Sequence, residues 1–109
     1  MHEIKAIIRP DRLEAVLKAL HEQPQLPGVT VSRVHGYGRH VNDDLAAPSF
    51  GETVMIKLEI IVSAEQLRAV VDTIQAVART GRGGDGKIFI SDIRDAITIH
   101  SGATGAAAI

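Results

Sequence analysis

The chain has 109 residues, 45% of them hydrophobic, which suits one compact domain with a modest core. A formal net charge of −1, with one Tyr, two Phe and no Trp, argues against the basic, base-stacking surfaces that bind nucleic acids. The absence of cysteine excludes disulfides and thiolate metal sites, and no apolar run is long enough to span a membrane, so we expect a cytoplasmic protein without membrane insertion.

The first part of the chain predicts a strand, a helix and a second strand. Residues 3–9 alternate in polarity as a strand does, and Pro10 ends the run. From Asp11 the apolar residues recur at helical spacing until the breaker segment 23–28. Residues 29–38 are rich in β-branched side chains and predict the second strand. The helical stripe consists of Leu13, Val16, Leu17 and Leu20.

Residues 39–52 have no clear periodicity, and an irregular segment of this length in a small domain is usually functional or mobile. Residues 53–62 then alternate strictly, which predicts a third strand. Ser63 and Gln66 form a capping box that begins a helix reaching about Arg79. The third strand should turn Val54, Ile56, Leu58, Ile60 and Val62 inward.

After this helix, residues 88–90 predict a short strand and residues 97–99 a further one. The tail 101–109 consists of small residues, so we expect it to order only against a ligand or a neighbour. The elements together predict an α+β fold. It is ferredoxin-like, βαββαβ, with a four-stranded antiparallel sheet, two helices on one face, and a short C-terminal strand and tail. The mixed open face of this sheet suggests burial in an oligomer.

A glycine-rich segment, Thr80–Phe89, separates the second helix from the next strand. Its glycines allow backbone N–H groups to converge on an anion, and Lys87 adds a positive charge. The spacing Gly81-x-x-x-x-Gly86-Lys87 approaches a Walker A motif, but Ile88 stands where Ser or Thr is needed and the order helix–loop–strand is wrong. An anion-binding loop and a plain reversal of the chain both remain open on these residues.

This segment resembles the signature loop of the PII signal transduction family, and the resemblance covers nearly the whole chain. It implies one PII-like domain over residues 1–109, with a T-loop at about 38–53, a B-loop at 80–87 and a C-loop at 100–109. It further implies a homotrimer that binds adenine nucleotides in the clefts between subunits. The other matching stretches are Ile4 to Pro10, Gly28 to Val31, Gly36 to Arg39, and Gly102 to Gly105 with Ile109.

The resemblance also implies roles for individual residues. Phosphates would be held by Gly84, Asp85, Gly86 and Lys87. Gly36, Gly38 and Arg39 would line the cleft, Thr30 and Ile61 would face the adenine, and the neighbour's C-loop would close over it. His40, Arg82 and His100 are further candidates near the phosphates. No catalytic residue is expected, and the five histidines form no ligand motif, so no intrinsic metal is expected either.

Several residues depart from the nitrogen-sensing members of that family. The segment 39–52 contains no tyrosine to modify, and His40 and Met55 replace residues that hold 2-oxoglutarate. Thr98 and His100 replace two arginines that grip the outer phosphates, which favours ADP or AMP over ATP. We therefore expect a PII-like sensor, divergent from the nitrogen-sensing type, that resembles the proteins linked to carbon uptake and carboxysomes, with bicarbonate as a further ligand.

Its expected partner is a membrane transporter or an enzyme of carbon or nitrogen metabolism, contacted through the T-loop. Three alternatives remain open. The first is a nitrogen-regulatory PII protein that senses ATP, ADP and 2-oxoglutarate. The second is a weak nucleotide hydrolase. The third is a structural or metal-tolerance trimer of related fold, in which the glycine-rich loop has no ligand.

Overall fold

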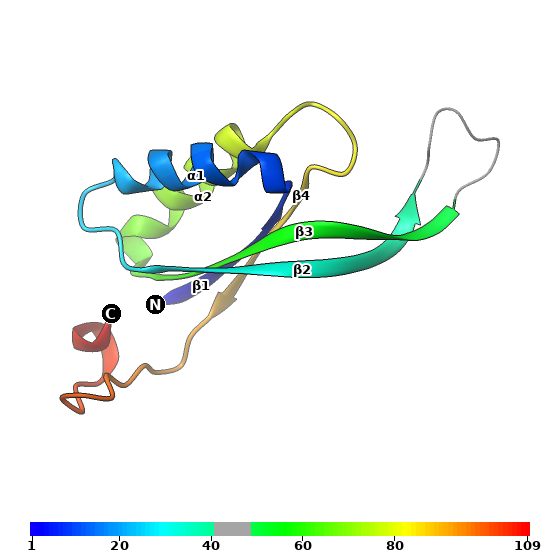
Figure 1. The fold of residues 1–109 in the computed structure, drawn as a ribbon. Helices are drawn as coiled ribbons and strands as arrows, with labels where there is room; N and C mark the ends of the chain where they lie inside the picture. Colours follow the sequence, from blue (N-terminus) through cyan, green and yellow to red (C-terminus); the bar gives the residue numbers. More distant parts are fainter. Residues whose placement is uncertain (41–48) are drawn as a thin grey trace.

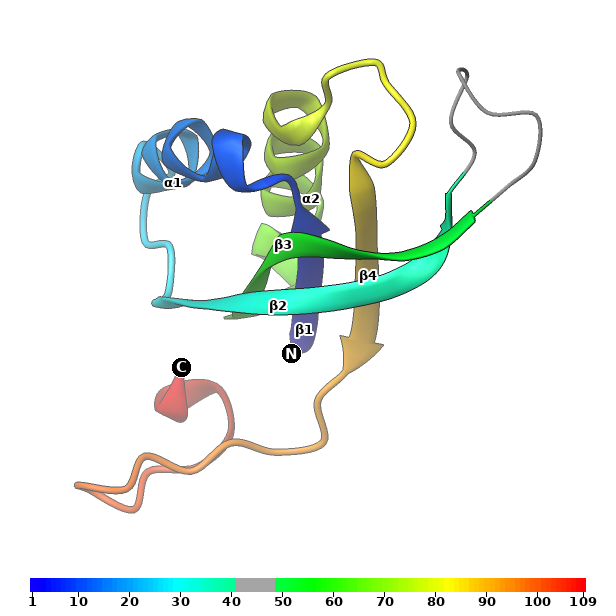
Figure 2. The ribbon, with the colours of Figure 1, turned by 45° about the vertical axis from the view of Figure 1, so that its right-hand side comes forward.

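The computed structural model of the protein describes residues 1–40 and 49–109, and of residues 39, 40, 49 and 50 it describes the backbone alone. Four strands form an antiparallel sheet in the order β2-β3-β1-β4, and both helices cover one face (Figures 1 and 2). The expected ferredoxin-like fold is confirmed. The elements are β1 (His2–Ile8), η1 (Pro10–Arg12), α1 (Leu13–His21), β2 (Val29–His40), β3 (Ser49–Val62), α2 (Ala64–Ala78), β4 (Gly86–Asp92) and η2 (Gly105–Ala108).

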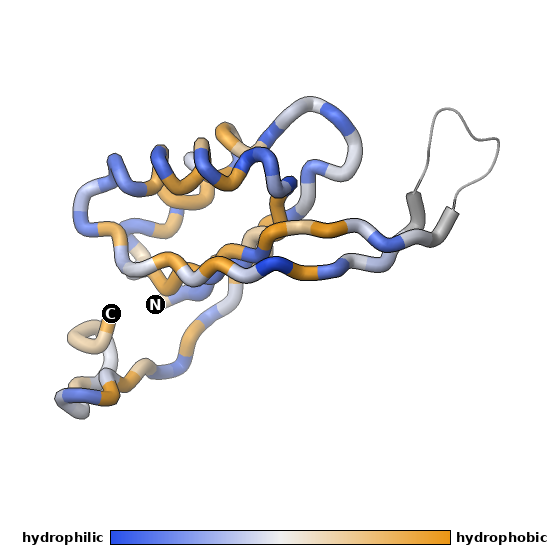
Figure 3. Tube along the Cα trace, viewed as in Figure 1, coloured by the Kyte–Doolittle hydropathy of each residue, from blue (hydrophilic) through white to orange (hydrophobic). Residues whose placement is uncertain are grey.

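The core lies between the sheet and the two helices. Alternation along β1 and β3 sends every second side chain to the helix face, and the register sets Ile4 beside Ile60 and Ile90. Hydrophobic residues accordingly follow the strands and recur along the helices, whereas the loop before β4 is hydrophilic (Figure 3). The core cluster contains Ile4, Ala6, Ile8, Val16, Leu20, Ile56, Leu58, Ile60, Val62, Val70, Val71, Ile74 and Ala78.

Side-chain hydrogen bonds fix both ends of α2. At its start, the predicted capping box is present, with the backbone N–H of Ser63 donating to Gln66 Oε1 at 3.1 Å. At its end, Arg12 Nε and Nη2 donate to the carbonyl of Val77 at 2.9 and 2.6 Å. Arg12 lies in η1, a single 3-10 turn, so α1 begins at Leu13 rather than Asp11. The second helix therefore presents the following loop at a fixed position.

The prediction that residues 39–52 are irregular is wrong at both ends of the segment. β2 continues to His40 and β3 begins at Ser49, with Arg39 paired to Phe50 and Gly38 to Gly51. A backbone ladder depends on N–H and C=O groups and can continue where side chains lose their alternation. The pair forms a long hairpin that extends beyond the rest of the sheet (Figure 1). The remaining part of the expected T-loop, 41–48, lies outside the described residues.

The predicted strand 97–99 is also wrong. Ile97 forms only an isolated bridge with Thr104, and the segment folds back on itself instead of joining the sheet. The N–H of Thr98 donates to the carbonyl of Ala103 at 2.8 Å, which closes a turn with His100 at its tip. Ile97 and Ile99 stay 67% and 100% exposed. Across residues 1–40 and 49–109, no helix is long and apolar enough to cross a membrane.

Candidate functional site

The glycine-rich loop lies at the end of the sheet from which the β2–β3 hairpin extends (Figures 1 and 2). It connects the end of α2 to the first residue of β4, Gly86, which is paired with Ile8 at the end of β1. Residues 81–84 of the loop are exposed. A ligand can therefore reach the loop from solvent and from the side of the hairpin.

Asp85 organises the loop from within. Its carboxylate accepts hydrogen bonds from the backbone N–H of Thr80 at 2.8 Å, from that of Gly81 at 3.1 Å, and from the Thr80 hydroxyl. The Thr80 hydroxyl, followed by Arg9, holds the pKa of the Asp85 carboxyl well below its usual value. With its oxygens occupied in this way, Asp85 is a structural anion of the loop and not a poised general base.

Arg9 links the loop to the end of β1 and was not predicted as a site residue. Its Nε donates to Asp85 Oδ1 at 2.9 Å and its Nη2 donates to the carbonyl of Gly83 at 2.6 Å. The second contact turns the Gly83 carbonyl toward the guanidinium of Arg9. Among the described residues, the N–H groups of Gly83 and Gly84 donate to no protein acceptor. The loop thus has donors available for an anion.

Two glycines of the loop are required by its geometry. Gly84 has a φ of +84° and Gly86 a φ of +106°, both in the left-handed region that side chains disfavour. A Cβ at Gly86 would lie only 1.7 Å from the carbonyl oxygen of Ile7. At this position β4 therefore lies closer to β1 than a residue with a side chain would allow. The glycines therefore fix how the loop passes into the strand.

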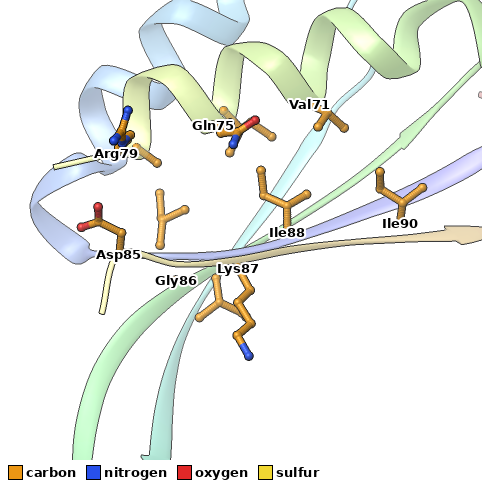
Figure 4. A pocket seen from close by; sticks show the side chains of 12 residues that line it. Val71, Gln75, Arg79, Asp85, Gly86, Lys87, Ile88 and Ile90 are labelled. Atoms are coloured by element: carbon orange, nitrogen blue, oxygen red, sulfur yellow. The ribbon is translucent and has the colours of Figure 1, made fainter. Parts of the chain in front are cut away.

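Lys87 follows directly and points to the face of the sheet opposite the helices (Figure 4). The register places Lys87 and Lys57 on either side of Ile7, on the open face. Lys57 is paired with Glu59 at 3.5 Å. The ammonium of Lys87 has no carboxylate partner among the described residues, so it is available to an anionic ligand.

Two further predicted residues, Gly36 and Gly38, lie on the hairpin at this end of the sheet, paired with Thr53 and Gly51. Arg39 and His40 occupy the last positions of β2, and their side chains lie outside the described part of the chain. Arg82 is exposed on the glycine-rich loop. These residues share one end of the molecule with Gly84–Lys87.

The base of the hairpin carries a cross-strand pair. His35 Nδ1 contacts the Glu52 carboxylate, and this hydrogen bond lowers the pKa of Glu52. His35 immediately precedes Gly36, so the pair joins β2 to β3 beside the two hairpin glycines.

Thr30 and Ile61 lie at the other end of the sheet. Ile61 pairs with Glu3 and Lys87 pairs with Ile7, a separation of four residues on β1, or about 13 Å along the strand. Beside Thr30 and Ile61 is a cavity of about 480 Å³ that is closed in part by Ala108 and Ile109 of the tail. His100 is exposed at the tip of the turn and does not line this cavity. Within one chain, the predicted residues therefore form two separate groups.

Metal-ligand side chains do not gather anywhere in the described part of the chain. Residues 1–40 and 49–109 contain no group of three or more His, Asp or Glu side chains placed to hold an ion.

Comparisons with known proteins agree with the fold. The family described as "Nitrogen regulatory protein P-II" matches residues 1–103. The nitrogen regulatory protein P-II of Rhizobium meliloti strain 1021 is 39% identical over 113 residues, covering 100% of both chains. The structure of the B. subtilis GlnK–ATP complex has a TM-score of 0.84 at 30% identity and covers 99% of this chain and 96% of that one. Arabidopsis thaliana PII bound to citrate has a TM-score of 0.81 at 38% identity and covers 99% of this chain and 91% of the other. The chain belongs to the P-II family of signalling proteins.

Proposed function

We propose that this P-II protein binds adenine nucleotides, ADP and AMP in preference to ATP, in clefts between the subunits of a homotrimer. In this proposal Gly84, Asp85 and Gly86 contact the phosphates through their backbone, and Lys87 through its ammonium. The observation that carries the proposal is the loop itself. It has free N–H groups, an available lysine and a backbone that Arg9 and Asp85 hold in place. The relative from B. subtilis was solved with ATP, which supports a nucleotide as the ligand.

The position of the second group supports a site between subunits. Ile61 lies about 13 Å along the sheet from Lys87 of the same chain, and Thr30 is on β2, which β3 and β1 separate from β4. A nucleotide that contacted both groups of one chain would therefore have to be fully extended. A second copy can bring its Thr30 end to this loop, together with its C-terminal tail. The open face, where Lys5, Lys57 and Glu59 stand beside exposed Phe89, is then part of the contact between copies.

The preference for ADP and AMP follows from the composition of the tail. Residues 96–109 contain no lysine or arginine, and His100 is their one ionisable side chain. A γ-phosphate would lack the two charge-assisted contacts that arginines would give, each worth about 1–3 kcal/mol. The loop itself still serves the inner phosphates. His40 and Arg82 are proposed to contribute only secondary contacts.

We further propose that nucleotide occupancy changes the conformation of the β2–β3 hairpin and thereby regulates a partner transporter or enzyme. Gly36 and Gly38 join this hairpin to the phosphate end of the cleft, so contacts there act directly on its base. The residues that differ from the nitrogen-sensing members of the family favour a partner in inorganic-carbon metabolism, with bicarbonate as a co-ligand.

Calorimetric titration of the intact protein with AMP, ADP and ATP, with and without bicarbonate, tests the proposal. We expect ADP and AMP to bind at least as tightly as ATP, and Lys87→Gln to weaken the binding of ADP by about tenfold or more. Lys18→Gln removes an exposed charge from α1 and serves as the control, with no expected change. ATP binding far tighter than that of ADP and AMP contradicts the preference. Equal binding by wild type and Lys87→Gln contradicts the site.

A second candidate is nitrogen regulation with 2-oxoglutarate sensing, which the names of the relatives favour. The residue that would correspond to the carboxylate-binding lysine is Met55, whose side chain is uncharged and 9% exposed. A methionine offers a dicarboxylate no counter-charge, so we rank this candidate second. Tight binding of 2-oxoglutarate in the presence of nucleotide and Mg²⁺ would reverse the order.

A further inference from the structure

A cavity of about 420 Å³ lies on the helix side of β4, between that strand and α2 (Figure 4). β4 is an edge strand, and α2 covers it incompletely. Ile90 is 47% exposed, although its partner on β1, Ile4, is fully buried. The cavity is on the opposite side of β4 from the ammonium of Lys87. Asp85, Gly86 and Lys87 of the proposed phosphate loop line one end of it, so the cavity adjoins the proposed nucleotide cleft on the other side of β4.

The walls of the cavity are apolar. Val71 of α2 faces Ile88 and Ile90 of β4 across it (Figure 4), and Ile74 of α2 also lines it. Ile74 is fully buried and Val71 is 7% exposed, so the inner end is continuous with the core. Water held there would find few hydrogen-bond partners, and an apolar chain would replace it favourably.

Two polar side chains of α2 stand at the edge of the cavity. Gln75 and Arg79 are one helical turn apart and both are exposed. In the described part of the chain, neither forms a hydrogen bond or an ion pair with another residue. Asp85 also lines the cavity, but its carboxylate is already occupied by Thr80 and Arg9. The charge offered to a ligand is consequently positive.

We propose that this cavity binds an amphipathic monocarboxylate, with its hydrocarbon chain between Val71, Ile88 and Ile90 and its carboxylate at Arg79 and Gln75. The guanidinium decides the class of ligand. An apolar side chain from another protein would fill the walls but would leave Arg79 without a counter-charge, whereas a carboxylate satisfies both ends. The volume suits a ligand of small-molecule size.

The test is a titration of the intact protein, labelled at isoleucine methyl groups, with straight-chain carboxylates from butanoate to octanoate. We expect chemical-shift changes at Ile74, Ile88 and Ile90 and none at exposed Ile97 and Ile99. Each additional buried methylene should strengthen binding by about fourfold. Primary alcohols of matched length should bind about tenfold more weakly, because they lack the charge that Arg79 recognises.

Variants separate the proposed contact from general hydrophobic binding. Arg79→Gln should remove the advantage of carboxylates over alcohols. Arg68→Gln should keep it, because Arg68 lies on the same helix, is 78% exposed and pairs with Asp72 at 3.7 Å. Gln75→Trp places a large ring at an exposed position over the opening and should abolish binding without unfolding the protein.

Three results would overturn the proposal. They are unchanged methyl shifts at Ile88 and Ile90, equal affinities for carboxylates and alcohols, and a carboxylate preference that persists in Arg79→Gln. A neighbouring chain that fills the cavity in the assembled protein would give the first of these results. Because Lys87 also borders the proposed nucleotide site, the titration is repeated with Lys87→Gln. The carboxylate preference should persist in that variant, and its loss would place the carboxylate in the nucleotide cleft and overturn the proposal.

Discussion

Replacing Gly86 by alanine tests whether the close approach of β4 to β1 fixes the glycine-rich loop. The new Cβ would lie 1.7 Å from the carbonyl oxygen of Ile7 and 2.7 Å from its carbonyl carbon. Both atoms belong to the backbone of a central strand, so no side chain can move aside to relieve the clash. The two strands must separate where β4 begins, and the loop must shift with them.

The expected loss has two contributions. Placing a Cβ at a φ of +106° costs about 1–2 kcal/mol. Forcing the paired strands apart adds about 1–3 kcal/mol, the usual range for overpacking. The variant should therefore lose about 2–5 kcal/mol from a free energy of unfolding that is typically about 5–15 kcal/mol. Nucleotide affinity should fall as well, because the loop donors are displaced.

Gly81→Ala is the matched control. Gly81 has a φ of +88°, but a Cβ there would meet no atom within 4 Å. This variant should show only the backbone cost of about 1–2 kcal/mol. Urea unfolding of both variants, followed by circular dichroism, gives the comparison. If the two lose the same free energy within about 0.5 kcal/mol, the steric argument is refuted.

Three further predictions concern the charges of the loop. Arg9→Lys should reduce the affinity for ADP by about tenfold, because lysine cannot make both contacts to the loop, whereas Arg12→Lys should affect stability and leave calorimetric affinity unchanged. The pKa of Asp85 is lower in the folded protein than in the unfolded chain, so its contribution to stability is present above about pH 4 and is lost below it. Urea midpoints measured from pH 3 to pH 7 should consequently fall less steeply on the acid side in Asp85→Asn than in the wild type. Phosphate release from ATP should match that of buffer, and a turnover that survives Lys87→Ala would contradict both the site and the absence of catalysis.

The strands of the sheet were predictable because the signals are local. Alternation in residues 53–62 identifies the buried face of β3, and the capping box at Ser63 fixes the start of α2. The positions of the strand ends were not predictable. Pairing between Arg39 and Phe50 depends on the backbone of a partner strand, and the side chains of the segment give no indication of it.

Part of the candidate site could be read from the chain and part could not. The glycines and Lys87 are adjacent in sequence, so their composition predicts an anion-binding loop, with a plain reversal of the chain as the alternative. Arg9 lies 76 residues before Asp85, and its role appears only once β1 and β4 are paired. A lone arginine before a proline carries no signal of such a contact.

In the tail, by contrast, the side-chain pattern predicts a strand at residues 97–99 that does not form. Ile97 and Ile99 alternate with polar residues as in a strand, but their side chains have no sheet within reach and the segment closes on itself through Ala103 and Thr104. Periodicity reports which residues can share a face. It does not report whether a partner for that face exists in the same chain.

The central claim, that one nucleotide site is built from two subunits, is tested most directly by mixing two defective variants. Lys87→Gln damages the phosphate half of the site, and Ile61→Asp damages the other half, which lies at the far end of the same sheet. Each variant alone should bind ADP weakly. When the two are unfolded together and refolded at equal concentrations, about a quarter of the interfaces combine an intact Lys87 with an intact Ile61 from the neighbour, and calorimetry should recover that fraction of tight sites. A mixture that binds no better than its components would contradict an intersubunit site.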